Sequence, residues 1–217
     1  MKESELRSEL KRMISSLKGE IYGFVKVASE DDIRGQKDYY EKIMREYFKV
    51  KDLIFIPIPD LILVFESYTT DDGWKLIAIE LKSFQPDRVK EGMRKAFREI
   101  GQPLRYHLMG FDTTVLWHVF DEEIDDELIK NYIALIDETI TKLSLPLEYY
   151  ATKITEKGEF IYAKLITSRM DLKNLVRLFE EALAYCKNPL IYEKKSNDVL
   201  RRREAIKLLL GIPGKRL

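Results

Sequence analysis

The sequence places three ionisable residues at one end of a predicted β-hairpin. Asp60 precedes the apolar run LILVF, and Glu80 and Lys82 end the apolar run IAIELK, with the turn residues TTDDG (69–73) between the two runs. Antiparallel pairing about this turn puts Asp60 roughly opposite Lys82, and the two-residue repeat of a strand puts Glu80 and Lys82 on one face. Charged groups beside strands that belong in a core are costly unless they serve a purpose. We therefore expect a functional cluster here.

The residue types in this cluster indicate metal chemistry. Hard divalent cations such as Mg²⁺ use one or two protein carboxylates and keep several waters, which leaves room for phosphate oxygens. Asp60 and Glu80 supply such carboxylates, and the Lys82 ammonium can hold an attacking water or help to deprotonate it. These roles are those that metal-assisted hydrolysis of a phosphodiester needs.

Pro59-Asp60 and Glu80-Leu81-Lys82 resemble the two halves of the motif of the PD-(D/E)xK nuclease superfamily. The resemblance implies a restriction-endonuclease-like fold and a Mg²⁺ or Mn²⁺ ion bound by Asp60, Glu80 and the backbone carbonyl of Leu81. It also implies that Lys82 orients or activates the nucleophilic water.

Two further features of this superfamily have matches in the chain. Members carry a helix before the hairpin, often with a glutamate that assists a metal; Glu41, in a predicted helix over 36–49, matches best, and Glu46 is the alternative. RecB-like members carry Q-x-x-x-Y on the helix after the lysine, and Gln102 and Tyr106 have this spacing. The resemblance implies that this pair contacts the lysine or the DNA backbone.

The resemblance covers roughly residues 36–120 and does not include the four cysteines that hold an iron–sulfur cluster in many relatives. The chain has one cysteine, Cys186. We therefore expect no iron–sulfur cluster and no intrachain disulfide. The pattern is more similar to simpler archaeal or viral nucleases and to Holliday-junction resolvases.

Several of these residues also have a purely structural interpretation. Glu41 is equally consistent with a surface glutamate paired with a basic residue four positions away. Gln102 and Tyr106 are equally consistent with a polar residue and a core aromatic near a helix break. His107 and His118 lack the spacing of a metal-binding motif, and we expect them to be packed in the structure.

A basic cluster near the end of the chain is the second candidate contact with a phosphate backbone. Arg201, Arg202 and Arg203 either bind phosphates or form a solvated helix face. Lys and Arg total 37 and Asp and Glu total 37, so the net charge is zero and does not indicate a protein that coats DNA. A nuclease remains compatible with this balance, since carboxylates that bind metal offset basic residues elsewhere.

The periodicity predicts an α/β fold with a mixed sheet flanked by helices, an additional N-terminal helix and a C-terminal hairpin with helices. The family resemblance implies that this sheet is restriction-endonuclease-like. We expect an N-terminal extension (1–35), a nuclease core (36–145) and a C-terminal extension packed on the core (146–217). The predicted helices cover 3–17, 36–49, 87–109, 124–143, 171–186 and 197–210. The predicted strands cover 21–28, 53–58, 61–68, 74–84 and 113–120, with a hairpin over 147–167 that turns at 156–159.

These observations predict a Mg²⁺-dependent deoxyribonuclease. Endonucleolytic cleavage is favoured, and branched or structured DNA is one candidate substrate. The alternatives are a catalytically silent DNA-binding or assembly module of the same fold, and a protein-interaction scaffold without nucleic acid. We expect a homodimer, no membrane partner, no signal peptide and a cytoplasmic location, which is the host cytoplasm if the protein is viral. Abundant Glu and Lys with few Asn and Gln is typical of thermophile proteins.

Overall fold

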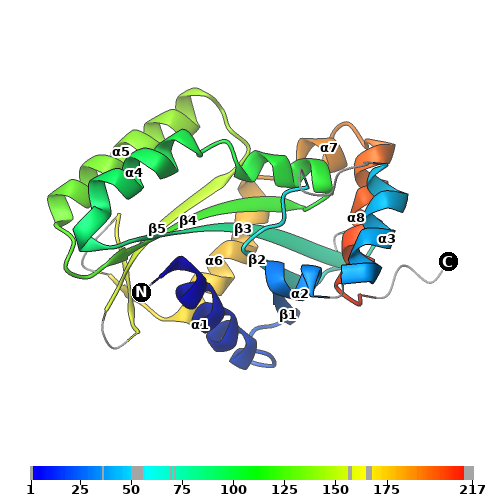
Figure 1. Cartoon of the computed structure of the whole chain (residues 1–217), viewed down its shortest axis with the longest axis horizontal. Coiled ribbons are helices and arrows are strands. Elements are labelled where there is room, and N and C mark those ends of the chain that lie inside the picture. The colour runs from blue at the N-terminus through cyan, green and yellow to red at the C-terminus, as the bar shows by residue number, and fades with distance from the viewer. Residues whose placement is uncertain are drawn as a thin grey trace.

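A computed structural model describes residues 2–35, 37–49, 56–68, 70, 72–155, 158–164 and 168–212. The chain forms an α/β fold in which a seven-stranded mixed sheet is flanked by helices, as Figure 1 shows. None of the helices in these ranges is long and apolar enough to cross a membrane.

The strands follow one another across the sheet in the order of the sequence, from β1 to β7. The strand pairs at both sides of the sheet are antiparallel, whereas β3, β4 and β5 run parallel to one another. The seven strands are β1 (Phe24–Ser29), β2 (Leu61–Glu66), β3 (Trp74–Phe84), β4 (Thr113–Asp121), β5 (Glu148–Ile154), β6 (Phe160–Tyr162) and β7 (Arg169–Met170).

Helices cover both faces of the sheet. On one face, α1 and α6 bury the odd-numbered residues of β3 in an apolar cluster. On the other face, α4 and α5 lie over one end of the sheet and α3 with α8 over the other end (Figure 1). The α-helices are α1 (Glu3–Ser16), α2 (Glu30–Arg34), α3 (Lys37–Phe48), α4 (Val89–Arg98), α5 (Asp126–Lys142), α6 (Leu172–Tyr185), α7 (Pro189–Tyr192) and α8 (Asn197–Leu209).

Most of the predicted elements are confirmed within one to three residues. The helical repeat in the first segment buries Leu6, Leu10 and Ile14 of α1 against the sheet, as an amphipathic stripe requires. Parallel strands need a crossover connection, and α4 with the following turn supplies it between β3 and β4, as α5 does between β4 and β5.

Two predictions about the elements were wrong. The helix predicted over 87–109 is broken: α4 ends at Arg98, and a separate 3₁₀ helix, η3 (Pro103–Met109), follows. Proline lacks the amide hydrogen that a continuous helix would need, so Pro103 begins the new helix. The strand predicted over 53–58 falls partly outside the described residues, and its described part, 56–58, is not a strand. The strand that pairs with the free side of the β2–β3 hairpin is instead β1, which is antiparallel to β2.

The three predicted parts of the chain contribute to one sheet. β1, from the segment before residue 36, pairs with β2, and β5, from the segment after residue 145, pairs with β4. The predicted hairpin after 147 is present as β5 and β6, and β7 adds one more short strand that the sequence pattern did not indicate.

Candidate active site

The β2–β3 hairpin brings Asp60 and Glu80 together, in a register that differs from the predicted one. Leu61 pairs with Ile79, so the next residue out, Asp60, lies opposite Glu80 rather than Lys82. The backbone amide of Leu81 donates a hydrogen bond to Asp60 Oδ2 at 2.9 Å. The predicted juxtaposition is therefore confirmed, with a register correction of two residues.

Glu80 is the most deeply buried member of the group, with 2% of its surface exposed. Its Oε1 accepts a hydrogen bond from Lys82 Nζ at 2.8 Å, and its Oε2 accepts one from the Tyr106 hydroxyl. Burial raises the pKa of Glu80, Lys82 opposes this change, and the nearby Asp60 adds to it. Asp60, Glu80, Lys82 and Tyr106 form the candidate active site and are called the catalytic cluster below, after the role that the sequence predicts for the first three.

Lys82 lies at the accessible side of this cluster. Its side chain is 17% exposed, and Glu99 Oε2 lies 3.6 Å from its Nζ. Burial disfavours the charged form of Lys82, but the hydrogen bond to Glu80 and the charges of Glu80, Glu3 and Asp60 together offset this effect and raise the pKa of Lys82. The side chain is therefore an ammonium group that donates to Glu80 in this structure.

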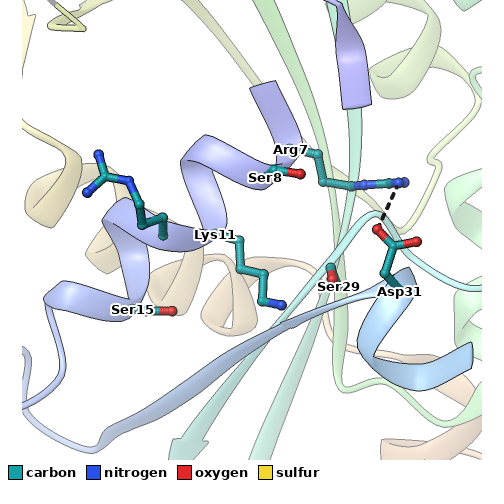
Figure 2. A pocket seen from close by; sticks show the side chains of 7 residues that line it. Arg7, Ser8, Lys11, Ser15, Ser29 and Asp31 are labelled. Carbon is teal, nitrogen blue, oxygen red and sulfur yellow. Dashed lines mark hydrogen bonds and ion pairs between the residues drawn. The ribbon is translucent and has the colours of Figure 1, made fainter. Parts of the chain in front are cut away.

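The N-terminal helix contributes Arg7, which the sequence analysis did not consider. Arg7 Nη1 donates to Asp60 Oδ1 at 3.1 Å and to Glu30 Oε2 at 3.3 Å, and Nη2 donates to Asp31 Oδ2 at 3.4 Å. Figure 2 shows the Arg7 side chain extending from α1 toward Asp31. The guanidinium therefore ties α1 and α2 to the end of the hairpin.

Glu3, in the first turn of α1, is a second residue that the sequence analysis missed. The backbone amide of Ser83 donates a hydrogen bond to its carboxylate. Partial burial raises the pKa of Glu3; the Lys82 charge opposes this change, and the Asp60 charge adds to it. Glu3 and Arg7 are four residues apart on an amphipathic helix and so share one face. That spacing shows only that the two side chains leave the same side of α1, and it does not indicate that they reach the hairpin.

Glu41 is not brought to the catalytic cluster. It lies on α3 and pairs with Arg45, four residues on, at 3.7 Å. In the described part of the chain, no contact is recorded between Glu41 and the catalytic cluster, because α3 packs against α8 at the other end of the sheet. Glu46 lies on the same helix and is exposed.

Gln102 and Tyr106 have different environments in the structure, and of the two only Tyr106 belongs to the catalytic cluster. Tyr106 is 1% exposed and donates to Glu80, so it positions a carboxylate and presents no surface to a substrate. Gln102 is the N-cap residue before η3, and its hydrogen bonds in the described ranges are made by its backbone. The 3₁₀ geometry of η3, rather than the predicted continuous helix, places the two residues.

Arg203 has a structural environment that excludes the predicted phosphate contact. It is 4% exposed, and its Nε and Nη1 donate to Asp72 Oδ2 and Asp112 Oδ2, both at 2.8 Å. Gly110, at a φ of +89°, packs so closely that a Cβ there would lie 2.6 Å from the Arg203 Cβ. Lys207 Nζ joins from the next turn of α8, 3.1 Å from Asp72 Oδ2. Arg203, Lys207, Asp72 and Asp112 are called the Arg203 cluster below.

The other two arginines of the basic run also have protein partners. Arg201 pairs with Asp198 at 3.1 Å, and Arg202 donates to the Leu108 carbonyl at 3.1 Å and lies over the Phe48 ring. Arg203 of α8 donates to the carbonyl of Trp74, the first residue of β3, whereas Glu80 and Lys82 are nearer the other end of that strand. The structure therefore does not bring the basic run to the catalytic cluster.

Both histidines are packed in the interior, as predicted. His107 Nε2 lies 2.6 Å from the Pro146 carbonyl oxygen, and His118 Nδ1 lies 3.1 Å from the Tyr149 hydroxyl. Burial lowers the pKa of both imidazoles, and for His118 the combination with the Lys82 charge lowers it to about 3. Cys186, which is half-buried, donates to Glu148.

The donor set of the catalytic cluster is compatible with a small hard cation. Asp60 and Glu80 provide carboxylate oxygens, and the Leu81 carbonyl faces the same side of β3 as its amide, which already bonds to Asp60. Mg²⁺ needs no more than two protein carboxylates because waters complete its shell. No group of three or more His, Cys, Asp or Glu side chains in the described ranges is arranged to hold a metal. With these two carboxylates alone, most of the coordination shell of such an ion would consist of water.

Comparisons with family models, with curated protein sequences and with solved structures find no match to this chain.

Proposed function

We propose that the chain is a Mg²⁺- or Mn²⁺-dependent nuclease of the PD-(D/E)xK type that hydrolyses phosphodiester bonds in DNA, with endonucleolytic cleavage favoured. The observation that carries the proposal is the approach of Asp60 to Glu80 and Lys82 at one end of a hairpin whose strands are otherwise mostly apolar. A buried carboxylate, a second carboxylate and an accessible ammonium group are the parts that such hydrolysis uses.

The residues of this chain divide the work as follows. Asp60, Glu80 and the Leu81 carbonyl would hold the ion, which supplies charge stabilisation at the phosphate when bound. Lys82, which is an ammonium group in this structure, would orient the attacking water by donating a hydrogen bond to it, and the proton of that water would pass to the solvent. Tyr106 keeps Glu80 in place.

The second candidate function is a catalytically silent DNA-binding or assembly module of the same fold. One observation favours it: each of the four carboxylate oxygens already accepts a hydrogen bond, from Arg7, the Leu81 amide, Lys82 and Tyr106. Such a closed set of bonds is stable without a metal, as a structural network would be.

A metal titration combined with a cleavage assay separates the two candidates. The full-length protein is titrated with Mg²⁺ and Mn²⁺ by calorimetry and incubated with labelled duplex, single-stranded and four-way-junction DNA, beside Asp60→Asn. The nuclease predicts a metal-binding isotherm and cleavage that both disappear in the variant. A silent module predicts DNA retention with no isotherm that depends on Asp60. A homodimer that cuts both strands stays a prediction, which sedimentation of the intact protein tests.

A further inference from the structure

A polar pocket of about 280 Å³ lies between α1 and the junction of β1 with α2. Its lining consists of three cations, Arg7, Lys11 and Arg12, three serines and one carboxylate, Asp31. Figure 2 shows Arg7 and Lys11 leaving the same side of α1 toward the strand that carries Ser29 and the helix that carries Asp31. The pocket therefore offers guanidinium, ammonium and hydroxyl groups to one ligand, which is the chemistry of an anion site.

The pocket adjoins the catalytic cluster through a shared side chain. Arg7 lines the pocket, and its Nη1 lies 3.1 Å from Asp60 Oδ1. Its Nε is buried and has no hydrogen-bond partner among the described residues. Arg7 and Lys11 are one helical turn apart, so they stand one above the other and extend the site away from Asp60 along α1.

The ion pairs that Lys11 and Arg12 form in this structure are weak. Lys11 pairs with Asp32 at 2.5 Å, with both side chains about a third exposed or more, and Arg12 pairs with Glu9 at 2.5 Å with 73% of its side chain exposed. Ion pairs in such positions contribute little to stability because water screens them. Both cations can therefore exchange a carboxylate for a phosphate at little cost.

We propose that this pocket binds a backbone phosphate of DNA next to the phosphate that is hydrolysed at Asp60. Arg7, Lys11 and Arg12 neutralise it, and the Ser15 hydroxyl is a further donor. The inference rests on the proposed function and adds to it the surface that positions the substrate. Such a site would also allow a chain of zero net charge to bind DNA, because a local group of cations beside the cleavage site is sufficient.

The test measures DNA binding without cleavage, on the full-length protein in EDTA. Lys11→Gln/Arg12→Gln is compared with Lys130→Gln/Lys142→Gln, which removes two cations from α5 on the opposite face of the sheet. The control is matched, since Lys142 is 72% exposed and pairs with a glutamate of its own helix, as Arg12 does at 73%. The dissociation constant of a fluorescent duplex is followed against KCl concentration.

We expect the α1 double variant to bind about tenfold more weakly at low salt and to lower the slope of log K against log salt by about 0.9, the value for one phosphate contact. The α5 variant should match the parent protein. Equal affinities and slopes for the two variants would overturn the inference. If circular dichroism shows that the α1 variant does not fold, Ser8→Asp is the substitute. It places a negative charge in the pocket that repels a phosphate, without removing an ion pair, and the same weakening of DNA binding is expected.

The outcomes distinguish this inference from the proposed function. Cleavage by the parent protein together with unchanged binding by the α1 variant overturns the inference alone. Binding that depends on α1, without any Mg²⁺- or Mn²⁺-dependent cleavage, overturns the proposed function and leaves the phosphate site in a silent module. No salt-sensitive binding of DNA by the parent protein overturns both and supports a scaffold without nucleic acid.

Discussion

The two ends of β3 carry two charged clusters, each with two carboxylates and at least one basic side chain, that differ in how fully their donors are used. In the Arg203 cluster, the guanidinium makes five hydrogen bonds, to Asp72, Asp112 and the carbonyls of Gly110 and Trp74, and so uses all of its donors. In the catalytic cluster, Lys82 donates to Glu80 and keeps an accessible ammonium group. Saturated donors indicate a structural network, and accessible ones indicate a site that can take a ligand.

Asp72 and Glu80 differ in their electrostatics, whereas burial raises the pKa of Asp112 in the Arg203 cluster as it raises that of Glu80. Burial by itself would raise the pKa of Asp72, but hydrogen bonds and charge from Arg203 and Lys207 lower it to about 2. Burial raises the pKa of Glu80, and Lys82 does not fully offset it. A carboxylate that lacks sufficient positive charge in the folded protein is one that a bound cation would stabilise.

The largest expected effect is the loss of cleavage when the catalytic cluster is broken. Asp60→Ala and Lys82→Ala should each lower Mg²⁺-dependent DNA cleavage by at least about a hundredfold, while circular dichroism shows a folded protein. Lys75→Ala is the matched control, because Lys75 is a lysine of the same strand that pairs with Glu180 at 2.9 Å. Robust activity in either cluster variant would refute the mechanism.

The next largest effect is on stability, at the other end of β3. Arg203→Met should lower the free energy of unfolding by about 3–5 kcal/mol, because it leaves Asp112 buried without its cation. Arg201→Met, which loses only the partly exposed pair with Asp198, should cost about 0–1 kcal/mol. Urea unfolding measures both. Unchanged stability with weaker DNA binding in Arg203→Met would restore the phosphate role for this residue.

Tyr106→Phe tests how the catalytic cluster is held together. Removing the hydroxyl leaves Glu80 Oε2 without its donor and should lower the free energy of unfolding by about 1–3 kcal/mol. Tyr40→Phe is the control, because the Tyr40 hydroxyl is buried and has no partner among the described residues. Its removal should be neutral or slightly stabilising. Equal effects of the two substitutions would show that Tyr106 is only a core aromatic.

The two ends of β3 should respond to acid in different pH ranges. His118, next to Lys82 in the β3–β4 register, stays neutral in the fold because its pKa is lowered from 6.5 to about 3. The unfolded chain takes up this proton first, so stability falls by up to about 1.4 kcal/mol per pH unit as pH drops below 6.5. Asp72, with its pKa lowered from 3.8 to about 2, adds its loss only below pH 3.8.

Urea unfolding between pH 7 and 4.5 measures the contribution of the histidine. His118→Gln should show a shallower fall of stability over this range than the parent protein. A parallel fall in the two proteins would mean that His118 is protonated in the folded state, contrary to its buried position.

The smallest expected effect is at Glu41. Glu41→Gln removes a partly exposed pair with Arg45 and should change the free energy of unfolding by no more than about 0.5 kcal/mol, with unchanged cleavage and Mg²⁺ affinity. Calorimetry and the cleavage assay check this together. A tenfold loss of Mg²⁺ affinity would return Glu41 to the metal site that the family resemblance assigned to it.

The local patterns of this sequence were sufficient to predict most helices and strands and the approach of Asp60 to Glu80. Alternating and helical repeats predict the hairpin, α1, α3 and α5, because each period follows from the geometry of one element. The hairpin itself brings Asp60 near Glu80, since the partners are close in sequence and joined by a turn. The exact pairing was two residues off because a turn that is read from composition does not specify its own length.

Contacts between residues that are distant in sequence could not be predicted from local patterns. Nothing local to α1 shows that Arg7 contacts Asp60, 53 positions later, or that α3 packs against α8 and so carries Glu41 away from the cluster. Likewise, three consecutive arginines look alike in sequence, but only Arg203 points into the interior.

The sequence by itself therefore determined the chemical groups of the candidate site and the hairpin that joins them, because strand geometry acts over a few residues. The tertiary structure alone decided which charged residues surround that hairpin. It placed Arg7 and Glu3 beside the catalytic cluster and buried Arg203 in a saturated network at the other end of β3. The physical reason is that burial and the supply of opposite charge depend on how helices pack on the sheet, and that packing joins segments from the whole chain.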